Sequence, residues 1–350
     1  MWPGFIIEGT SGEDRVQTHS ANTISVESGS SRNRLIAALL AFCAVLFCFW
    51  FAGRHFAIEQ RIGGHLPSTF AAFALLLAPY WFFGFGLAPV LASIRNRAIR
   101  VLLPGVLVIP YLIFSLPRGE FRWSYGLLLP GITVGLACLF EFVGPKTAAI
   151  AWQDVIALCL VGFPVEFRLL PGAFPHSGLS AFSKFLLLDA ALYAYLVVRR
   201  LNGVGYNFSP RLRDFAIGLR NWALYACIAL PLGFLLHFIS FYRRVPSIGT
   251  VSSALLVTFF FVAMPEELFF RGLLQNMLEV RYGARRALRI ASIVFGLSHF
   301  NKPLPFNWRY VVMATVAGIF YGLAWRDRRR LLSSATTHTL VDVVWSLWFR

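Results

Sequence analysis

Hydrophobic and polar positions alternate along the chain in long blocks. Four stretches of about 16 to 25 residues contain no Asp, Glu, Lys or Arg, namely 35–53, 68–92, 221–242 and 310–325. Each is close to the roughly 20 residues that a helix needs to cross the hydrocarbon layer of a membrane. Because lipid offers the backbone no hydrogen-bonding partners, the pattern predicts membrane-spanning helices.

The complete pattern predicts an all-α integral membrane protein with about eleven transmembrane helices. The expected spans are 35–53, 68–92, 101–117, 123–141, 147–165, 179–198, 221–242, 249–280, 286–300, 310–325 and 331–349. Residues 201–220 contain Arg, Gly and Pro and predict a basic cytosolic connection. We therefore expect an N-terminal multi-span membrane region (35–200) of unknown role and a C-terminal core (221–350), preceded by a disordered polar tail (1–34).

The distribution of charge along the chain predicts its orientation in the membrane. The 350 residues are 57% hydrophobic, with a net charge of +16 and a mean hydropathy of +0.66. The basic residues stand in short clusters between apolar runs, which argues against nucleic acid and for the lipid bilayer as partner. With the N-terminus in the cytoplasm, clusters at 95–100, 199–220, 281–289 and 326–330 lie on the cytosolic side, as the positive-inside rule requires. We expect a bacterial inner (plasma) membrane protein.

One predicted span contains charged residues that are expensive to bury. Glu266, Glu267 and Arg271 lie inside the apolar run 249–280. Glu267 and Arg271 are four residues apart, so they share a helix face and can pair, whereas Glu266 points about 100° away. Glu266 is therefore a candidate general base, and Pro265 before it weakens the helix and makes room for water.

Two later spans contribute imidazoles. His299 follows Phe295 by four residues, and His338 precedes Asp342 by four, so each pair shares a helix face. At about 1.5 Å per residue from the expected cytosolic helix ends, Glu266 and His299 lie about 20 Å deep. On the same scale His338 lies about 15 Å deep and Asp342 about 21 Å deep. These polar groups from three helices are therefore expected to meet at one depth.

The three segments resemble the signature of the CAAX protease and bacteriocin-processing family of intramembrane proteases. That signature is EExxxR, then FxxxH, then HxxxN or HxxxD, on successive helices. The matching residues here are Glu266, Glu267 and Arg271, then Phe295 and His299, then His338 and Asp342. The resemblance covers only the C-terminal part of the chain. It implies an intramembrane endopeptidase of CAAX-type protein processing, which hydrolyses a peptide bond of a membrane-associated protein or peptide.

The resemblance also implies roles for single residues. Glu266 activates the hydrolytic water with help from His299, while His338 and Asp342 stabilise the oxyanion. The supporting residues are Glu267, Arg271 and Phe295. Many members have Asn in place of Asp342, and an ionised carboxylate would repel an oxyanion. Asp342 must therefore be protonated, or orient His338, or ligate a metal.

A metal is the alternative to a purely glutamate-based mechanism. Glu266, His299 and His338 could together hold a zinc ion. The chain has no HExxH helix, however, and we expect a metal-free mechanism without a cofactor.

Ionisable residues in the N-terminal region show no comparable pattern. Asp154, Lys184 and Asp189 lie in or near predicted spans, which makes each a candidate, although no partner pattern connects them. Glu166 and Arg168 superficially echo the glutamate motif at the end of a span, where we expect a loop.

Other function classes fit parts of the same pattern. A transporter would also place Glu, Arg and His at mid-membrane, and loss of Glu266 would then abolish flux without any peptide being cleaved. A non-catalytic scaffold or immunity protein of the same fold would keep its function without Glu266. A cysteine transpeptidase of the exosortase kind would need a Cys, Arg and His set, for which Cys159 has no convincing partners. The sequence leaves open the oligomeric state and the substrate, be it a prenylated tail, a bacteriocin leader or an anchored membrane protein.

Overall fold

The computed structural model describes residues 17–55, 58–176, 178–243, 245–301 and 306–349. Within these ranges the chain is mostly helical and contains no strand, and one isolated bridge pairs Phe241 with Phe349. Six helical segments are long and apolar enough to cross a membrane: Leu66–Gly84, Arg97–Arg118, Trp123–Val143, Ser180–Val198, Leu212–Leu235 and Ile248–Tyr282. A shorter apolar helix covers Leu35–Phe51. The predicted fold class, an all-α integral membrane protein, is confirmed.

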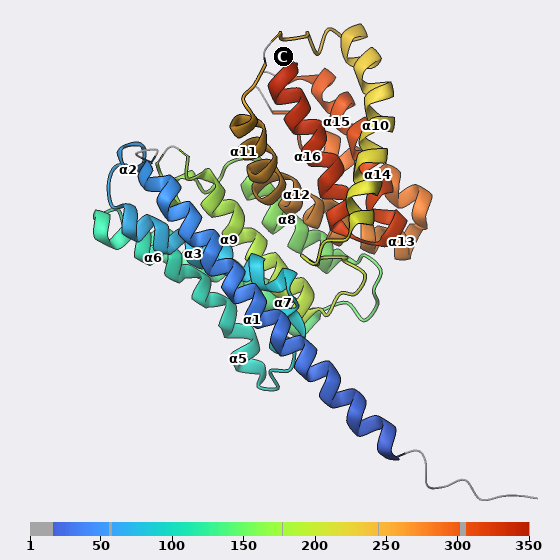
Figure 1. Cartoon of the computed structure of the whole chain (residues 1–350). Coiled ribbons are helices and arrows are strands. Elements are labelled where there is room, and N and C mark those ends of the chain that lie inside the picture. The colour runs from blue at the N-terminus through green and yellow to red at the C-terminus, as the bar shows by residue number, and fades with distance from the viewer. Residues whose placement is uncertain (1–16, 56–57, 177, 244, 302–305, 350) are drawn as a thin grey trace, which may run out of the picture.

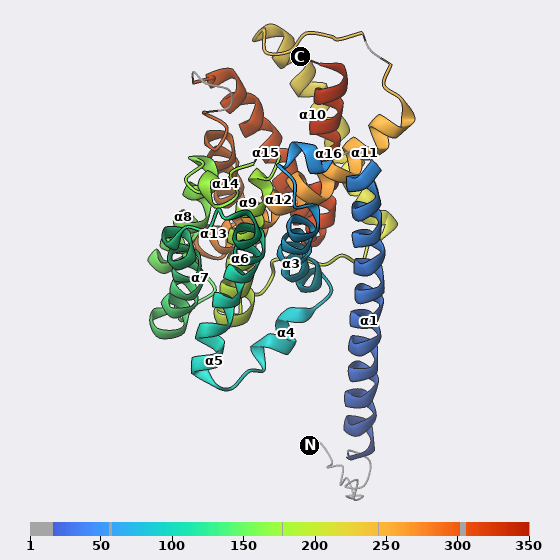
Figure 2. The ribbon, with the colours of Figure 1, turned by 90° about the vertical axis from the view of Figure 1, so that its left-hand side faces the viewer.

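The N-terminal helices pack side by side in one group (Figure 1). They are α1 (Gln17–His55), α2 (Ile58–Arg61), α3 (Leu66–Gly84), α4 (Leu87–Ala92), α5 (Arg97–Leu102), η1 (Leu103–Val108), α6 (Ile109–Ser115), η2 (Leu116–Arg118), α7 (Trp123–Val143), α8 (Trp152–Glu166), η3 (Pro171–Ala173), α9 (Ser180–Leu192) and η4 (Tyr193–Val198). Figure 2 shows α1 as a long rod at the edge of this group, beside α3.

The C-terminal helices form a second group, coloured yellow to red in Figure 1. They are α10 (Leu212–Leu235), α11 (Ile248–Thr258), η5 (Phe259–Ala263), α12 (Met264–Glu267), η6 (Leu268–Gln275), α13 (Asn276–Tyr282), α14 (Ala284–Leu297), α15 (Trp308–Arg328) and α16 (Leu331–Trp348). The segments from α11 to α13 follow one another as a single long helix. The last helix, α16, packs against α10, α15 and this long helix, so it lies at the centre of the group.

Three helix ends differ from the predicted ones. Helix α1 begins at Gln17, inside the tail predicted to be disordered, and no proline interrupts it before residue 34; residues 1–16 lie outside the described residues. Helix α10 begins at Leu212, inside the predicted connection, where Asp214 caps it by accepting the Arg211 N–H at 3.0 Å. The expected span 68–92 breaks at Gly86, whose φ of 96° no helix can continue.

The expected spans 286–300, 310–325 and 331–349 form α14, α15 and α16 but are not among the six apolar segments. Helix α16 shows the reason, because it carries many Ser, Thr and His residues. Ser333, Ser334, Thr337 and His338 are each at most 2% exposed, so these polar groups face other helices. The total of about eleven spans stays a prediction.

Candidate active site

Pro265 interrupts the long helix that contains the paired glutamates. A proline has no backbone N–H and cannot donate to the preceding turn. Here the Met264 N–H bonds to the carbonyl of Phe259, five residues back, where an α-helix would use the residue four back. The helix is wound as a π-helix on both sides of the short α12, in η5 and η6. Such π segments are frequent at functional sites, and these two flank Glu266 and Glu267.

Glu267 is the centre of a buried polar cluster. Its Oε2 lies 3.0 Å from Nε of Arg271, so the ion pair expected from their spacing is present, with both side chains fully buried. Ser334 of α16 donates its hydroxyl to the same oxygen. The other oxygen, Oε1, accepts a hydrogen bond from Nδ1 of His338 at 2.8 Å. Glu267 thereby connects its own helix to α16.

Aromatic rings enclose the guanidinium of Arg271. Its central carbon lies 4.9 Å from the ring centre of Phe295 and 5.7 Å from that of Tyr321. Ring faces attract a cation, and a buried cation gains more from them than an exposed one does. Phe295, which the FxxxH motif singled out, is therefore a packing residue that covers the charged pair.

The His338 ring has carboxylates on both of its nitrogens. While Nδ1 faces Glu267, Nε2 lies 3.4 Å from Oδ2 of Asp342 and 3.9 Å from Oε2 of Glu266. The ring stacks on Tyr321, with the ring centres 4.4 Å apart and the planes inclined by 16°. Residues 266, 338 and 342, which their expected depths placed together, thus meet around one imidazole.

His299 is held by its own helix end. Its Nδ1 lies 2.9 Å from the carbonyl oxygen of Phe295, and because a carbonyl only accepts, Nδ1 is the donor. A neutral ring in this tautomer has its lone pair on Nε2, which can then accept a proton. The ring also packs against Phe295 at 4.8 Å and Tyr310 at 4.9 Å between ring centres.

Two cavities meet these residues from different sides. A cavity of about 290 Å³ is lined by His299, His338 and Asp342 together with aromatic and aliphatic side chains of α10, α15 and α16. A second cavity, of about 500 Å³, is lined by Glu266 and by mostly apolar side chains of α8, α9, α14 and the long helix. The contact between Glu266 and His338 therefore lies where the two cavities approach each other.

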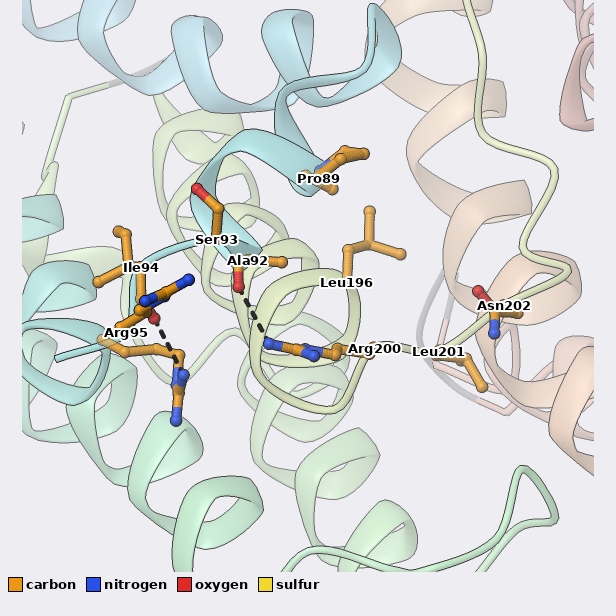
Figure 3. A pocket seen from close by; sticks show the side chains of 11 residues that line it. Pro89, Ala92, Ser93, Ile94, Arg95, Leu196, Arg200, Leu201 and Asn202 are labelled. Carbon is orange, nitrogen blue, oxygen red and sulfur yellow. Dashed lines mark hydrogen bonds between the residues drawn. The ribbon is translucent and has the colours of Figure 1, made fainter. Parts of the chain in front are cut away.

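A larger hollow of about 870 Å³ lies elsewhere in the N-terminal group (Figure 3). Two of the three arginines that line it donate to the backbone: Arg200 to the carbonyl of Ala92 at 3.0 Å, and Arg100 to that of Ile94 at 3.0 Å. No residue of the three motifs lines this hollow, so it is separate from the candidate active site.

The other ionisable residues of the N-terminal region have different surroundings. Asp154 forms a buried ion pair with Arg199 at 2.6 Å, between α8 and the end of η4. Lys184 lines the 500 Å³ cavity, and Asp189 is buried within α9. Glu166, expected in a loop, is the last residue of α8 and lines the same cavity, because the helix continues through Pro164. None of them joins the cluster around His338.

Sequence reasoning missed Ser334 and the hydrogen bond between Glu267 and His338. A signal for Ser334 was present, since Ser334, His338 and Asp342 follow one another at intervals of four residues along one face of α16. The bond to His338 had no such signal, because it depends on how α16 packs against α12.

The described residues contain no group of three or more His, Cys, Asp or Glu side chains arranged to hold a metal ion. Nε2 of His338 lies 3.9 Å from Oε2 of Glu266, and His299, whose Nδ1 is bonded to the carbonyl of Phe295, would meet a metal through Nε2. The metal-free mechanism stays a prediction.

Comparison with known proteins finds one family model, and it matches the stretch of the chain that contains the candidate site. Residues 248–344 match the family model described as Type II CAAX prenyl endopeptidase Rce1-like. The match runs from the start of α11 into α16 and includes all three motifs. No curated protein and no solved structure matches the chain.

Proposed function

Since residues 248–344 match the model of the Rce1-like CAAX endopeptidase family, we propose that this chain cleaves a membrane-associated protein or peptide with a water molecule activated by Glu266. The family is one of membrane proteases, and the apolar helices make the protein an integral membrane protein. The substrate is therefore a peptide segment held at or in the bilayer. The 500 Å³ cavity beside Glu266 gives such a segment a mostly apolar place to lie.

The different surroundings of two adjacent carboxylates carry the proposal. Glu267 is fully buried and holds Arg271, His338 and Ser334 in place. The side chain of Glu266 is 27% exposed and lines a cavity. A general base must reach both water and substrate, and of the two residues Glu266 is the one placed to do so.

The reaction then follows in two steps. The Glu266 carboxylate removes a proton from water, and the water oxygen forms a bond to the scissile carbonyl carbon, whose oxygen becomes an oxyanion. When the C–N bond breaks, the proton held by Glu266 passes to the leaving amine, and the carboxylate is restored. The second proton of the water remains on the new carboxylic acid product, and His299 assists by accepting that proton on Nε2 and releasing it to solvent.

His338 is placed to stabilise the oxyanion. Its Nδ1–H donates to Glu267, and carboxylates on both sides favour an imidazolium whose Nε2–H can donate to the developing charge. Three roles were open to Asp342: to be protonated, to orient His338 or to ligate a metal. Its distance of 3.4 Å from Nε2 favours orientation of the His338 ring. The oxyanion displaces Asp342 as the hydrogen-bond acceptor of Nε2.

Cleavage-site mapping tests the proposal. Purified protein in detergent is incubated with a library of peptides that carry an apolar anchor, and the products are sequenced by mass spectrometry. We expect defined products near the anchored end, and none with Glu266→Gln. If no peptide is cleaved and Glu266→Gln abolishes transport of a solute into vesicles, the protein is a transporter. If Glu266→Gln keeps full function in cells, the protein is a scaffold.

A further inference from the structure

The long helix Ile248–Tyr282 carries Glu266 and is called the catalytic helix below. The break at Pro265 leaves one backbone carbonyl of this helix without a hydrogen-bond donor from the same helix. The Met264 N–H bonds to the carbonyl of Phe259, five residues back. In the same register the carbonyl of Phe260 would receive its hydrogen bond from residue 265, but proline has no N–H. A buried carbonyl that loses its partner destabilises the folded protein, so the break needs a donor from elsewhere.

The N-terminal region supplies that donor. The hydroxyl of Tyr80, in α3, donates to the carbonyl of Phe260 at 3.2 Å. Tyr80 is 0% exposed, and its residue number is 180 lower than that of Phe260, so this hydrogen bond joins distant parts of the chain. The carbonyl it reaches lies six residues before Glu266, on the other side of Pro265.

Tyr80 is itself held in place from the connection between the two helix groups. The hydroxyl of Tyr206 donates to the backbone carbonyl of Tyr80 at 2.6 Å. The ring of Phe208 packs edge-on against Tyr80 at 5.5 Å and also contacts Phe260 at 5.9 Å between ring centres. The backbone N–H of Phe208 bonds to the carbonyl of Gly84, at the end of α3, at 2.8 Å. Tyr80 and the carbonyl of Phe260 therefore sit in one ordered aromatic cluster.

We propose that Tyr80 is a positioning residue for Glu266, and that holding the proline break of the catalytic helix is one role of the N-terminal membrane region. This rests on the proposed function of Glu266 as the general base. The hydroxyl of Tyr80 replaces the missing N–H of Pro265. It thereby fixes the π-helical turn that precedes Glu266. This turn sets the direction of the Glu266 side chain, which points to the cavity and to His338.

The variant Tyr80→Phe removes only the hydroxyl, and Tyr195→Phe is its matched control. Tyr195 is also buried in the N-terminal region and also donates its hydroxyl to a backbone carbonyl, that of Asp154 at 3.0 Å, away from the catalytic helix. Hydrogen–deuterium exchange is measured on peptides that cover residues 260–268. We expect exchange there to become at least about tenfold faster in Tyr80→Phe and to stay unchanged in Tyr195→Phe.

Cleavage kinetics give the second readout. We expect kcat of Tyr80→Phe to fall about 10- to 100-fold with KM within about twofold of wild type, because a misplaced base slows the chemical step. Tyr195→Phe should keep both constants. Exchange and kcat that are the same in the two variants would overturn the proposal. If the wild type cleaves no peptide, the proposed function fails, and the exchange experiment alone decides the role of Tyr80.

If Tyr80→Phe does not fold, the same substitution is made in a Pro265→Ala protein and compared there. In Pro265→Ala, residue 265 regains an N–H and the helix can return to its regular register, so the helix itself supplies a donor to the carbonyl of Phe260 and the hydroxyl of Tyr80 is no longer required. We expect the loss of folded protein caused by Tyr80→Phe to be much smaller in this background than in wild type. Equal losses in the two backgrounds would overturn the proposal.

Discussion

Glu266 and Glu267 are adjacent in sequence, but the side chain of Glu266 is 27% exposed and that of Glu267 is fully buried. The four-residue spacing to Arg271 predicted which of the two would pair. It could not predict that Glu267 also binds His338 and Ser334, because these contacts depend on the packing of α16. Spacing along one helix is visible in a sequence, whereas the register between two helices is not.

At the residue scale, Glu267→Gln should destabilise the protein. The change leaves the Arg271 guanidinium buried without its counter-charge, which costs about 3–5 kcal/mol in a buried pair. A thermal-shift assay in detergent should show Tm lower by about 5 °C or more, together with reduced yield and activity.

The control for this experiment is Asp327→Asn. Asp327 pairs with Arg220 at 2.8 Å, but these side chains are 25% and 57% exposed. An exposed pair contributes less than about 1 kcal/mol, so the control should melt close to wild type. Equal melting temperatures for the two variants would show that the Glu267–Arg271 pair does not stabilise the fold.

At the scale of the elements, apolar runs predicted most helices of the chain but not the form of the catalytic one. The length of a run of uncharged residues indicates the length of a membrane-spanning helix. Several observed helix ends lie within one turn of the ends of these runs. The run 249–280 gave no sign of π-helical turns, although Pro265 predicted a weakened ladder there. The early start of α10 was hidden because its first turn is charged and follows a glycine-rich segment.

Pro265→Ala tests whether the broken helix serves catalysis. An alanine restores a backbone N–H and allows a regular α-helix, so thermal stability should not fall. The direction of Glu266 should change, and kcat/KM should fall about 10- to 100-fold. The control is Pro130→Ala, since Pro130 lies inside α7 in the N-terminal group. We expect its cleavage rate to match wild type. A fully active Pro265→Ala would contradict a catalytic role for the break.

At the scale of the whole molecule, hydrogen bonds hold the four basic loops together at one end. Arg200 bonds to Ala92, and Asn276 to the carbonyl of Asn202. The loop after α15 joins the same end through the ion pair of Arg329 with Glu279 at 2.6 Å. Basic loops gathered at one end of the molecule fit the predicted orientation. In that orientation these loops lie in the cytosol and the loop after α10 lies on the opposite side.

Cysteine labelling tests this orientation. In a background without the five native cysteines, we expect Arg328→Cys to be labelled only from the cytosolic side and Val245→Cys only from the opposite side. Val245 is 98% exposed, and the side chain of Arg328 is 47% exposed, so reagents can reach both. Labelling after lysis serves as the control for reactivity. The same side for both positions would disprove the topology.

Metal removal tests the predicted cofactor-free reaction. We expect EDTA and phenanthroline to leave the cleavage rate unchanged, since the chain has no HExxH helix. Loss of activity that added zinc restores would instead identify Glu266, His299 and His338 as metal ligands.

The Glu266→Gln variant tests the central claim most directly, in a cleavage assay run beside a thermal-shift assay. The amide keeps the size of the side chain at the cavity wall and removes only the base. We predict a protein that inserts and melts like wild type, while peptide cleavage falls by at least about 100-fold, as is typical for loss of a general base. Near-normal turnover by a folded Glu266→Gln protein would contradict the mechanism.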